Sequence, residues 1–200
     1  MKLLVSAASP YVRKIRVLTR ELGITDAITE QTVATTAFNS DPSVIAANPM
    51  GKIPALIRDD APALYDSRVI SRFLNDTNDG AFYPAARIWE TLTLEATGDG
   101  IMDTAVSMAY EVRLRPEAEQ SPDWIEAQWQ KASRGIKAVN DRWMSHLSGP
   151  LDMSHIAIAC ALSYVDLRHD VRNWRDGNDA LAAWHVVFED RESMQATKVS

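Results

Sequence analysis

Apolar positions follow two different spacings along the chain, one before and one after about residue 80. In the first part, short apolar runs of strand length alternate with helical patterns. The run LLV at 3–5 predicts a strand, and apolar residues at helical spacing over 10–22 predict a helix that Gly23 ends. A strand-like DAITEQTV segment and a short helix over 42–47 follow. The predicted order of these elements is βαβα.

The segment from residue 53 to residue 80 predicts a hairpin and one more helix. IPALI at 53–57 and PALY at 62–65 are apolar runs separated by a short polar loop, and Asp66-Ser67 is a cap signal ahead of VISRFLNDT. We therefore expect residues 1–80 to form an α/β domain with the order βαβαββα.

From residue 87 onward the chain shows only long helical patterns with polar breaks. The segment IAIACALSYVDL at 156–167 is apolar almost all round, which is typical of a helix at the centre of a bundle. The prediction is an all-α domain over residues 86–200, so the fold class is α/β plus all-α.

Charge and cysteine content narrow the function classes. The formal net charge of −6 disfavours a nucleic-acid partner, because binding to phosphates uses a basic surface. The single cysteine, Cys160, lies in an apolar run and predicts a buried thiol. No signal-peptide pattern and no apolar run of membrane-spanning length is present. We expect a cytoplasmic protein that does not act on a membrane.

Standard catalytic motifs are absent from the sequence. The histidines at 146, 155, 169 and 185 lack metal-ligand spacing, so we expect no metal and place each at the surface or at a helix end. Three local features remain, namely S-P at 9–10, K-I-P at 52–54 and D-S at 66–67. Each has an ordinary explanation as a helix cap or a strand entry.

The same three features also suit an anionic peptide ligand. A hydroxyl at a helix N-terminus adds to the N–H donors and the positive end of the helix dipole. A proline that opens a strand can leave the preceding backbone free to pair with a peptide. The sequence pattern alone leaves both interpretations open.

Taken together, these stretches resemble the cytosolic glutathione S-transferases, especially a bacterial group whose first helix opens S-P-[FY]-x-R-K. The resemblance covers nearly the whole chain. The matching stretches are SPYVRKIRVLTRELG at 9–23, NPMGKIPAL at 48–56, LYDSRVISRFL at 64–74, DGIMD at 99–103, IAIACALSYVDLR at 156–168 and RESMQAT at 191–197.

The resemblance implies a thioredoxin-like N-terminal domain that binds glutathione as co-substrate, an all-helical domain that forms the electrophile pocket, and a homodimer. It implies that the Ser9 hydroxyl donates to the glutathione sulfur. Ile53, preceding a cis Pro54, would pair its backbone with the cysteinyl unit, and Asp66 and Ser67 would hold the γ-glutamyl end. The expected activity is conjugation of glutathione to small hydrophobic electrophiles, in detoxification.

Departures from family patterns restrict this expectation. The first strand ends in Val5-Ser6 rather than a tyrosine, so activation by tyrosine is not expected, although Tyr11 is placed to contact the edge of the site. No cysteine lies in the first 150 residues, which disfavours mixed-disulfide chemistry. Two alternatives stay open: a glutathione-fold protein that acts only through protein contacts, and a glutathione-dependent peroxidase or dehalogenase.

Three further groups of residues have open roles. Helical residues after DGIMD form either the electrophile wall or ordinary core, and basic residues of the first helix either attract glutathione or form a solvated face. The wall residues are Met102, Ala105, Val106 and Tyr110, and the basic residues are Arg13, Lys14, Arg16 and Arg20. At the start of the central helix, Asp152 can act as the N-cap. His155 stands where the family has Asp. It either makes the start of this helix sensitive to pH or is a tolerated substitution.

Overall fold

A computed structural model describes residues 1–199, which divide into two compact units. The N-terminal unit contains residues 1–84 together with the segment that begins at Glu192, and the helical unit contains residues 85–191. Residues 192–199 were expected in the helical domain, over 86–200, but they pack with the N-terminal unit. Ser200 lies outside the described residues.

The N-terminal unit is built on a mixed three-stranded sheet. Its elements are β1 (Lys2–Val5), α1 (Pro10–Glu21), a 3-10 turn (Thr25–Ala27), β2 (Thr29–Thr32), α2 (Pro42–Ala47), β3 (Ala55–Ile57) and α3 (Ser67–Thr77). The strand order is β2-β1-β3, with β1 parallel to β2 and antiparallel to β3. This arrangement confirms the predicted α/β fold of the first domain.

The second strand of the predicted hairpin is reduced to a single bridge between Leu56 and Leu64. Continued antiparallel pairing would set Pro62 opposite Arg58. Proline has no backbone N–H to donate to the ladder, so the pairing stops. The Arg58 guanidinium instead donates to the Pro62 carbonyl at 2.8 and 3.0 Å.

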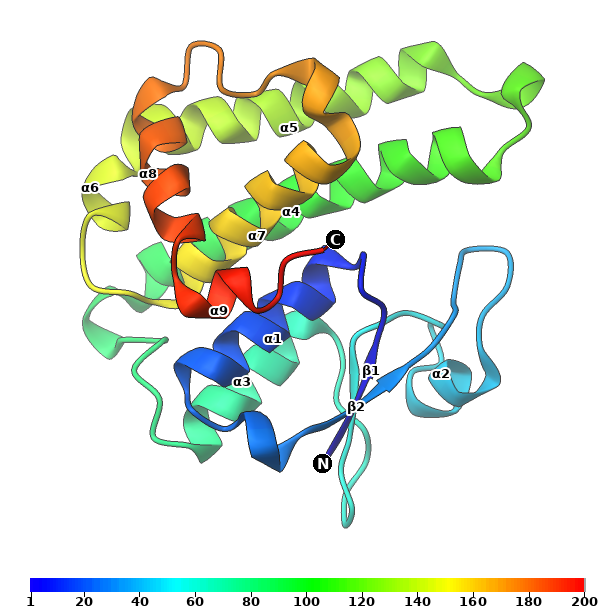
Figure 1. The fold of residues 1–200 in the computed structure, drawn as a ribbon, viewed down its shortest axis with the longest axis vertical. Helices are drawn as coiled ribbons and strands as arrows, with labels where there is room; N and C mark the ends of the chain where they lie inside the picture. The colour runs from blue at the N-terminus through cyan, green and yellow to red at the C-terminus, as the bar shows by residue number, and fades with distance from the viewer. Residues whose placement is uncertain (200) are drawn as a thin grey trace. The chain divides into compact units, whose positions relative to one another are not determined.

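Helices cover both faces of the sheet (Figure 1). On one face, Leu4 and Ala55 pack with Val44 of α2 in a buried cluster. Successive strand side chains alternate, so Leu3 and Leu56 point to the opposite face, where α1 and α3 lie. The core of this unit is therefore divided between the two sides of β1.

The C-terminal helix α9 (Glu192–Gln195) ties the end of the chain to α1. The Arg13 guanidinium donates to the Met194 carbonyl at 3.0 Å and to the Thr197 hydroxyl at 3.4 Å. Arg13 is only 7% exposed and Lys14 is fully buried, so the interpretation of a solvated basic face was wrong for these two residues. The docked α9 segment is the reason for the burial of Arg13.

The helical unit contains five α-helices and three 3-10 turns. They are a turn (Ala85–Arg87), α4 (Ile88–Leu114), a turn (Glu117–Glu119), α5 (Pro122–Arg142), α6 (Met144–Leu147), α7 (Met153–His169), a turn (Asp170–Arg172) and α8 (Asp179–Glu189). As predicted, α7 is buried on nearly all sides, and Cys160 within it is fully buried. Helix α4 lies beside α7 and carries Gly98 against the Ala157 backbone (Figure 1).

Candidate functional site

Ser9 lies between β1 and α1 and caps the helix. Its Oγ accepts a hydrogen bond from the Val12 N–H at 3.3 Å, and Pro10 occupies the first helical position. A hydroxyl that accepts through a lone pair still carries its own proton. Capping α1 and donating to an anion are therefore compatible roles for this half-buried serine.

Strand register brings the Ile53-Pro54 dipeptide to the same end of the sheet. Leu4 pairs with Ala55 in the antiparallel ladder, so the two residues before Ala55 lie beside the end of β1. The Ile53–Pro54 peptide is cis, as the resemblance implies. Within residues 1–199, neither the N–H nor the carbonyl of Ile53 has a hydrogen-bond partner. This backbone is open to pair with an extended peptide.

The same register places the start of α3 there as well. Leu56 and Leu64 exchange two backbone hydrogen bonds of 2.9 Å, and the chain then runs antiparallel to β3 toward its N-terminal end. Asp66 caps α3 by accepting from the Arg68 N–H at 3.0 Å, after a cis Tyr65–Asp66 peptide. Ser67 is 3% exposed, and its hydroxyl has no hydrogen-bond partner in the described part of the chain.

The sequence analysis missed two cations that act on Asp66. Arg68 pairs with this carboxylate at 2.8 Å, and the charge of the buried Lys14 also acts on it. Burial opposes ionisation of Asp66, but the bonds from Arg68 and the field of the two cations outweigh it and lower the pKa of the carboxyl. The position of Arg68 in D-S-R, two residues after the cap, was the available signal.

The predicted electrophile residues divide into buried and accessible members. Met102 and Ala105 are buried in the helical core, and the Ala105 carbonyl lies 2.8 Å from the His169 Nε2. These two side chains are therefore ordinary core residues rather than part of an electrophile wall. Val106 is half-buried and Tyr110 is 36% exposed, so both remain accessible; Tyr11, in the N-terminal unit, is half-buried.

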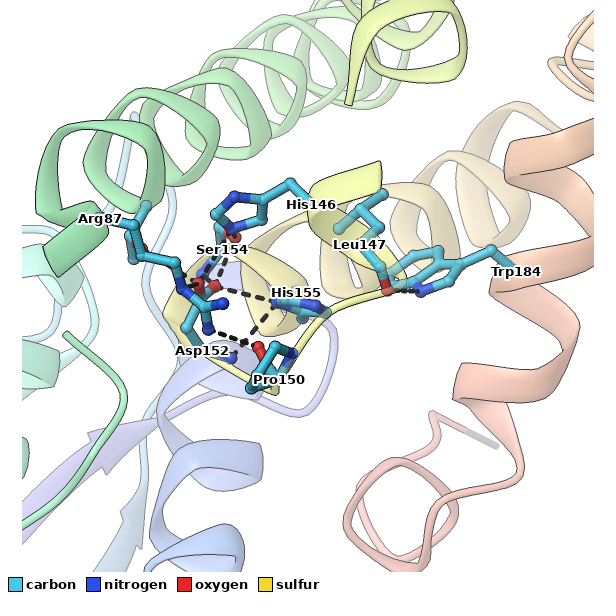
Figure 2. A network of polar contacts seen from close by, with 9 residues as sticks. Arg87, His146, Leu147, Pro150, Asp152, Ser154, His155 and Trp184 are labelled. Carbon is cyan, nitrogen blue, oxygen red and sulfur yellow. Dashed lines mark hydrogen bonds and ion pairs between the residues drawn. The ribbon is translucent and has the colours of Figure 1, made fainter. Parts of the chain in front are cut away.

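A second polar cluster surrounds the start of α7 (Figure 2). The Asp152 Oδ1 accepts from the Ser154 N–H at 3.1 Å, and Oδ2 accepts from the Thr91 hydroxyl at 3.0 Å. The His155 Nδ1 lies 3.3 Å from the Asp152 backbone nitrogen, in the place that the second side chain of a capping box occupies. An imidazole therefore takes the place of the usual second carboxylate.

The Asp152 carboxylate is surrounded by cationic and polar groups. His146 Nε2 lies 2.9 Å and Arg87 Nε 3.3 Å from its Oδ2, and His155 Nδ1 lies 2.9 Å from Oδ1. Burial opposes ionisation, but the hydrogen bonds from His155 and Ser154 and the field of the imidazoles prevail. They hold the pKa of this carboxyl well below its usual range.

The two imidazoles and the carboxylate have the residue types of a metal site, with donor atoms within 4.8 Å of one another. Both carboxylate oxygens are already hydrogen-bonded, and the guanidinium of Arg87 adds a positive charge that opposes a cation. The geometry is therefore that of a helix cap. Of the four histidines, His185 departs most from the expected surface or helix-end position, because it is 2% exposed in the middle of α8.

Both units match domains of one family. Residues 8–77 match the glutathione S-transferase N-terminal domain, and residues 122–185 match the glutathione S-transferase C-terminal domain. The chain belongs to the glutathione S-transferase family. In the described part of the chain, no helix combines the length and apolar character needed to cross a membrane.

Several relatives resemble this chain over its whole length. A glutathione transferase family member from Pseudomonas fluorescens Pf-5, solved with bound glutathione, is 37% identical, with a TM-score of 0.97 over 100% of this chain and 98% of its own. A second structure from that organism holds S-(propanoic acid)-glutathione, at 36% identity and TM-score 0.92 over 100% of both chains. The uncharacterized GST-like protein YibF of Escherichia coli (strain K12) is 31% identical over 99% of this chain and 98% of its own.

Proposed function

We propose that this protein is a cytoplasmic glutathione S-transferase that conjugates reduced glutathione to small hydrophobic electrophiles. The observation that carries the proposal is the Ser9 hydroxyl at the N-terminus of α1, at the end of the sheet that also holds the open Ile53 backbone. Asp66 and Ser67 lie at this end too and hold the γ-glutamyl group, with the ionised Asp66 facing its ammonium.

The proposed role of Ser9 is to stabilise the glutathione thiolate. A thiol with a pKa of about 8.5 is roughly 3% ionised at pH 7, and a pKa of about 6.5 makes it roughly 75% ionised. This shift of the pKa requires the thiolate to be stabilised by about 2.7 kcal/mol relative to the thiol. One hydrogen bond to a charged sulfur contributes about 1.5 to 3 kcal/mol, and the helix N-terminus adds about 0.3 to 1 kcal/mol. These two contributions suffice for the shift.

Ionisation alone gives little rate enhancement. A lower pKa also lowers nucleophilicity, and the net gain for a two-unit shift is about threefold. Most of the acceleration then comes from holding the electrophile. We assign this task to accessible residues of the helical unit, such as Val106 and Tyr110. One relative was solved with S-(propanoic acid)-glutathione bound, which supports the proposal that this protein also accommodates a glutathione adduct of that size.

Family membership also supports a homodimer as the working form of the protein. Sedimentation velocity at micromolar concentration measures this directly. We expect a species of twice the chain mass of 22.2 kDa. A species of single-chain mass at all concentrations would contradict the proposal.

The sequence provides a matched pair of variants for Ser9. Ser121 also precedes a proline and caps its helix, α5, by accepting from the Trp124 N–H at 3.2 Å. We expect Ser9→Ala to lower kcat/KM for a chloronitrobenzene by about tenfold or more. This figure is based on the loss of rate seen when an enzyme loses one hydrogen-bond donor to an oxyanion. Ser121→Ala should cost about 1 kcal/mol of stability as a lost cap and leave turnover unchanged.

Glutathione binding by calorimetry separates the alternatives. Binding without turnover across conjugation, peroxide and haloaromatic assays would contradict a transferase and favour a protein that acts through protein contacts. Turnover of peroxide or haloaromatic substrates alone would assign the same Ser9 to peroxidase or dehalogenase chemistry.

A further inference from the structure

The end of the chain is bound to α1 near both ends of that helix, and all of these contacts lie within the N-terminal unit (Figure 1). The Ser193 hydroxyl donates to the carboxylate of Glu21, the last residue of α1. The Arg13 guanidinium donates to the Met194 carbonyl at 3.0 Å, close to the first turn of the helix. We call residues 192–197 the C-terminal latch.

The contacts of the latch with Arg13 are buried. Met194 and Thr197 are both buried, as is Arg13 itself. The Thr197 hydroxyl donates to the Ser193 carbonyl at 2.8 Å and accepts from the Arg13 Nε at 3.4 Å, so the guanidinium meets two oxygens of the latch. A guanidinium is a rigid planar fork, and two acceptors restrict its orientation more than one does. The latch therefore fixes the position of Arg13.

Arg13 also closes the turn that contains Ser9. Its backbone N–H donates to the Ser9 carbonyl at 3.0 Å, in the same turn in which the Val12 N–H donates to the Ser9 Oγ. Arg13 therefore joins the latch, through its side chain, to the backbone of Ser9. A displacement of Arg13 moves the turn that orients the Ser9 hydroxyl.

The first turn of α1 is weakly stabilised by its own sequence. Asp41 and Asp66 cap α2 and α3 with a carboxylate, whereas α1 has the neutral Ser9 as its cap and no acidic residue in its first turn. The cations Arg13 and Lys14 follow directly, and positive charge near a helix N-terminus opposes the helix dipole. Helix ends with few stabilising contacts fray. The latch thus supports the part of α1 that needs support from another segment.

The proposed chemistry of Ser9 depends on its position. A hydrogen bond weakens steeply when its angle departs far from linearity, and functional donors have to be held to within about 0.5 Å of their working geometry. A frayed first turn would leave the hydroxyl in place as a group but not as an aligned donor to the sulfur.

We propose that the C-terminal latch positions Ser9 for stabilisation of the glutathione thiolate, and that Arg13 is the positioning residue through which the latch acts. This inference rests on the proposed transferase function and adds a second level of control over the same site. Arg13 and the latch act on the bound thiol only through Ser9.

The direct test is a double-mutant cycle on the pKa of the bound glutathione thiol, measured by ultraviolet difference absorbance. We expect Arg13→Gln to raise this pKa by about 0.5 to 1 unit, as part of the contribution of one hydrogen bond to a charged group. In a protein that already carries Ser9→Ala, Arg13→Gln should change the pKa by less than about 0.3 unit. A residue that acts through the Ser9 hydroxyl has no effect once that hydroxyl is removed.

Two variants that keep a positive charge at position 13 separate positioning from a direct electrostatic effect. Arg13→Lys replaces the planar fork by a single ammonium group. Thr197→Val removes the hydroxyl that accepts from Arg13 and leaves Arg13 itself intact. Each should raise the pKa of the bound thiol by about half as much as Arg13→Gln. Thr197→Val also tests the inference if Arg13→Gln fails to fold.

Ser193→Ala is the matched control, because it removes a buried hydrogen bond of the same latch at the far end of α1. It should lower the free energy of unfolding without changing the pKa of the bound thiol. Arg16→Gln removes a cation of α1 that pairs with Glu30 at 2.8 Å rather than with the latch. It should change the pKa of the bound thiol by less than about 0.3 unit.

Binding of S-methylglutathione, which has no ionisable thiol, gives a second readout. Its calorimetric Kd should differ by less than about twofold among the wild-type protein, Arg13→Gln and Thr197→Val, because Ile53 and Asp66 are not part of the latch. A merely structural role of the latch would weaken the binding of glutathione and of S-methylglutathione together, and would contradict the inference.

An equal rise of the pKa with and without the Ser9 hydroxyl would overturn the inference, because Arg13 would then act on the thiolate directly. An unchanged pKa in both Arg13→Gln and Thr197→Val would overturn it as well. Failure of the proposed function is seen in the wild-type protein alone, where glutathione would not bind or its bound thiol would titrate near the ordinary value of about 8.5.

Discussion

Asp41 and Asp66 cap their helices through the same kind of bond. Each carboxylate accepts from the N–H two residues later, at 2.8 Å from Ser43 and 3.0 Å from Arg68, and the pKa of each is lowered. They differ in their surroundings. Asp66 follows the bridge beside β3, at the end of the sheet where Ser9 and the open Ile53 backbone lie, and Asp41 precedes α2.

This contrast predicts the effect of removing one charge. Asn still caps a helix, so Asp66→Asn should keep the fold but weaken glutathione binding about tenfold through loss of the charged partner of the ligand ammonium. Asp41→Asn should leave binding unchanged. Calorimetric Kd values for both variants check this, and equal Kd values for the two variants would remove Asp66 from the site.

At the scale of elements, the start of α7 depends on one buried charge. Asp152 is fully buried among hydrogen-bond donors, whereas Asp141 forms an exposed pair with Lys137 on α5. We expect Asp152→Asn to lower the free energy of unfolding by about 3 kcal/mol. Asp141→Asn should change it by less than about 1 kcal/mol. Urea titration at neutral pH measures both values.

The lowered pKa of Asp152 also sets a pH dependence. A carboxylate with a folded-state pKa below its unfolded value stabilises the protein fully above about pH 4, and the stabilisation is lost as the pH falls below that value. The stability difference between wild type and Asp152→Asn should therefore shrink from pH 5 to pH 3. A difference that stays constant over this range would show that the charge of Asp152 contributes nothing.

Contact between α4 and α7 depends on a glycine. A Cβ at Gly98 would lie 2.9 Å from the Ala157 carbonyl carbon and 3.0 Å from its oxygen, and backbone atoms yield little. Gly98→Ala should therefore destabilise the protein by about 1 to 3 kcal/mol through overpacking.

Within residues 1–199, apart from the adjacent backbone of α4 itself, no atom lies within 4 Å of the ideal Cβ position at Gly100, two residues further along the helix. Gly100→Ala should stabilise the protein by up to about 1 kcal/mol through helix propensity. Thermal unfolding of both variants gives the comparison. Equal effects of the two substitutions would contradict the close approach of α4 and α7.

Across the whole molecule, patterns that repeat over many residues were readable from the sequence. The alternation of strand and helix in the first part and the all-round apolar α7 predicted the fold class, which the family domains confirm. The candidate site residues were readable because they are local cap and strand-entry signals, and strand register brings them to one end of the sheet: Ser9, Ile53, Pro54, Asp66 and Ser67. Their role in binding stays a prediction.

Features that depend on contacts between distant segments were not readable. The burial of Arg13 depends on a four-residue helix near the end of the chain, which is too short to show a periodic pattern. The contact between the Ala105 carbonyl and His169 depends on the register of α4 against α7, and no spacing within either helix reports that register.

The central claim is that this protein binds glutathione and ionises its thiol with help from Ser9. Ultraviolet difference absorbance of the thiolate in the complex, titrated with pH, measures the pKa of bound glutathione. We predict a value about two units below the ordinary 8.5 in the wild-type protein and in Ser121→Ala, and at least about one unit higher in Ser9→Ala. A bound thiol that titrates near 8.5 in the wild-type protein would contradict the claim.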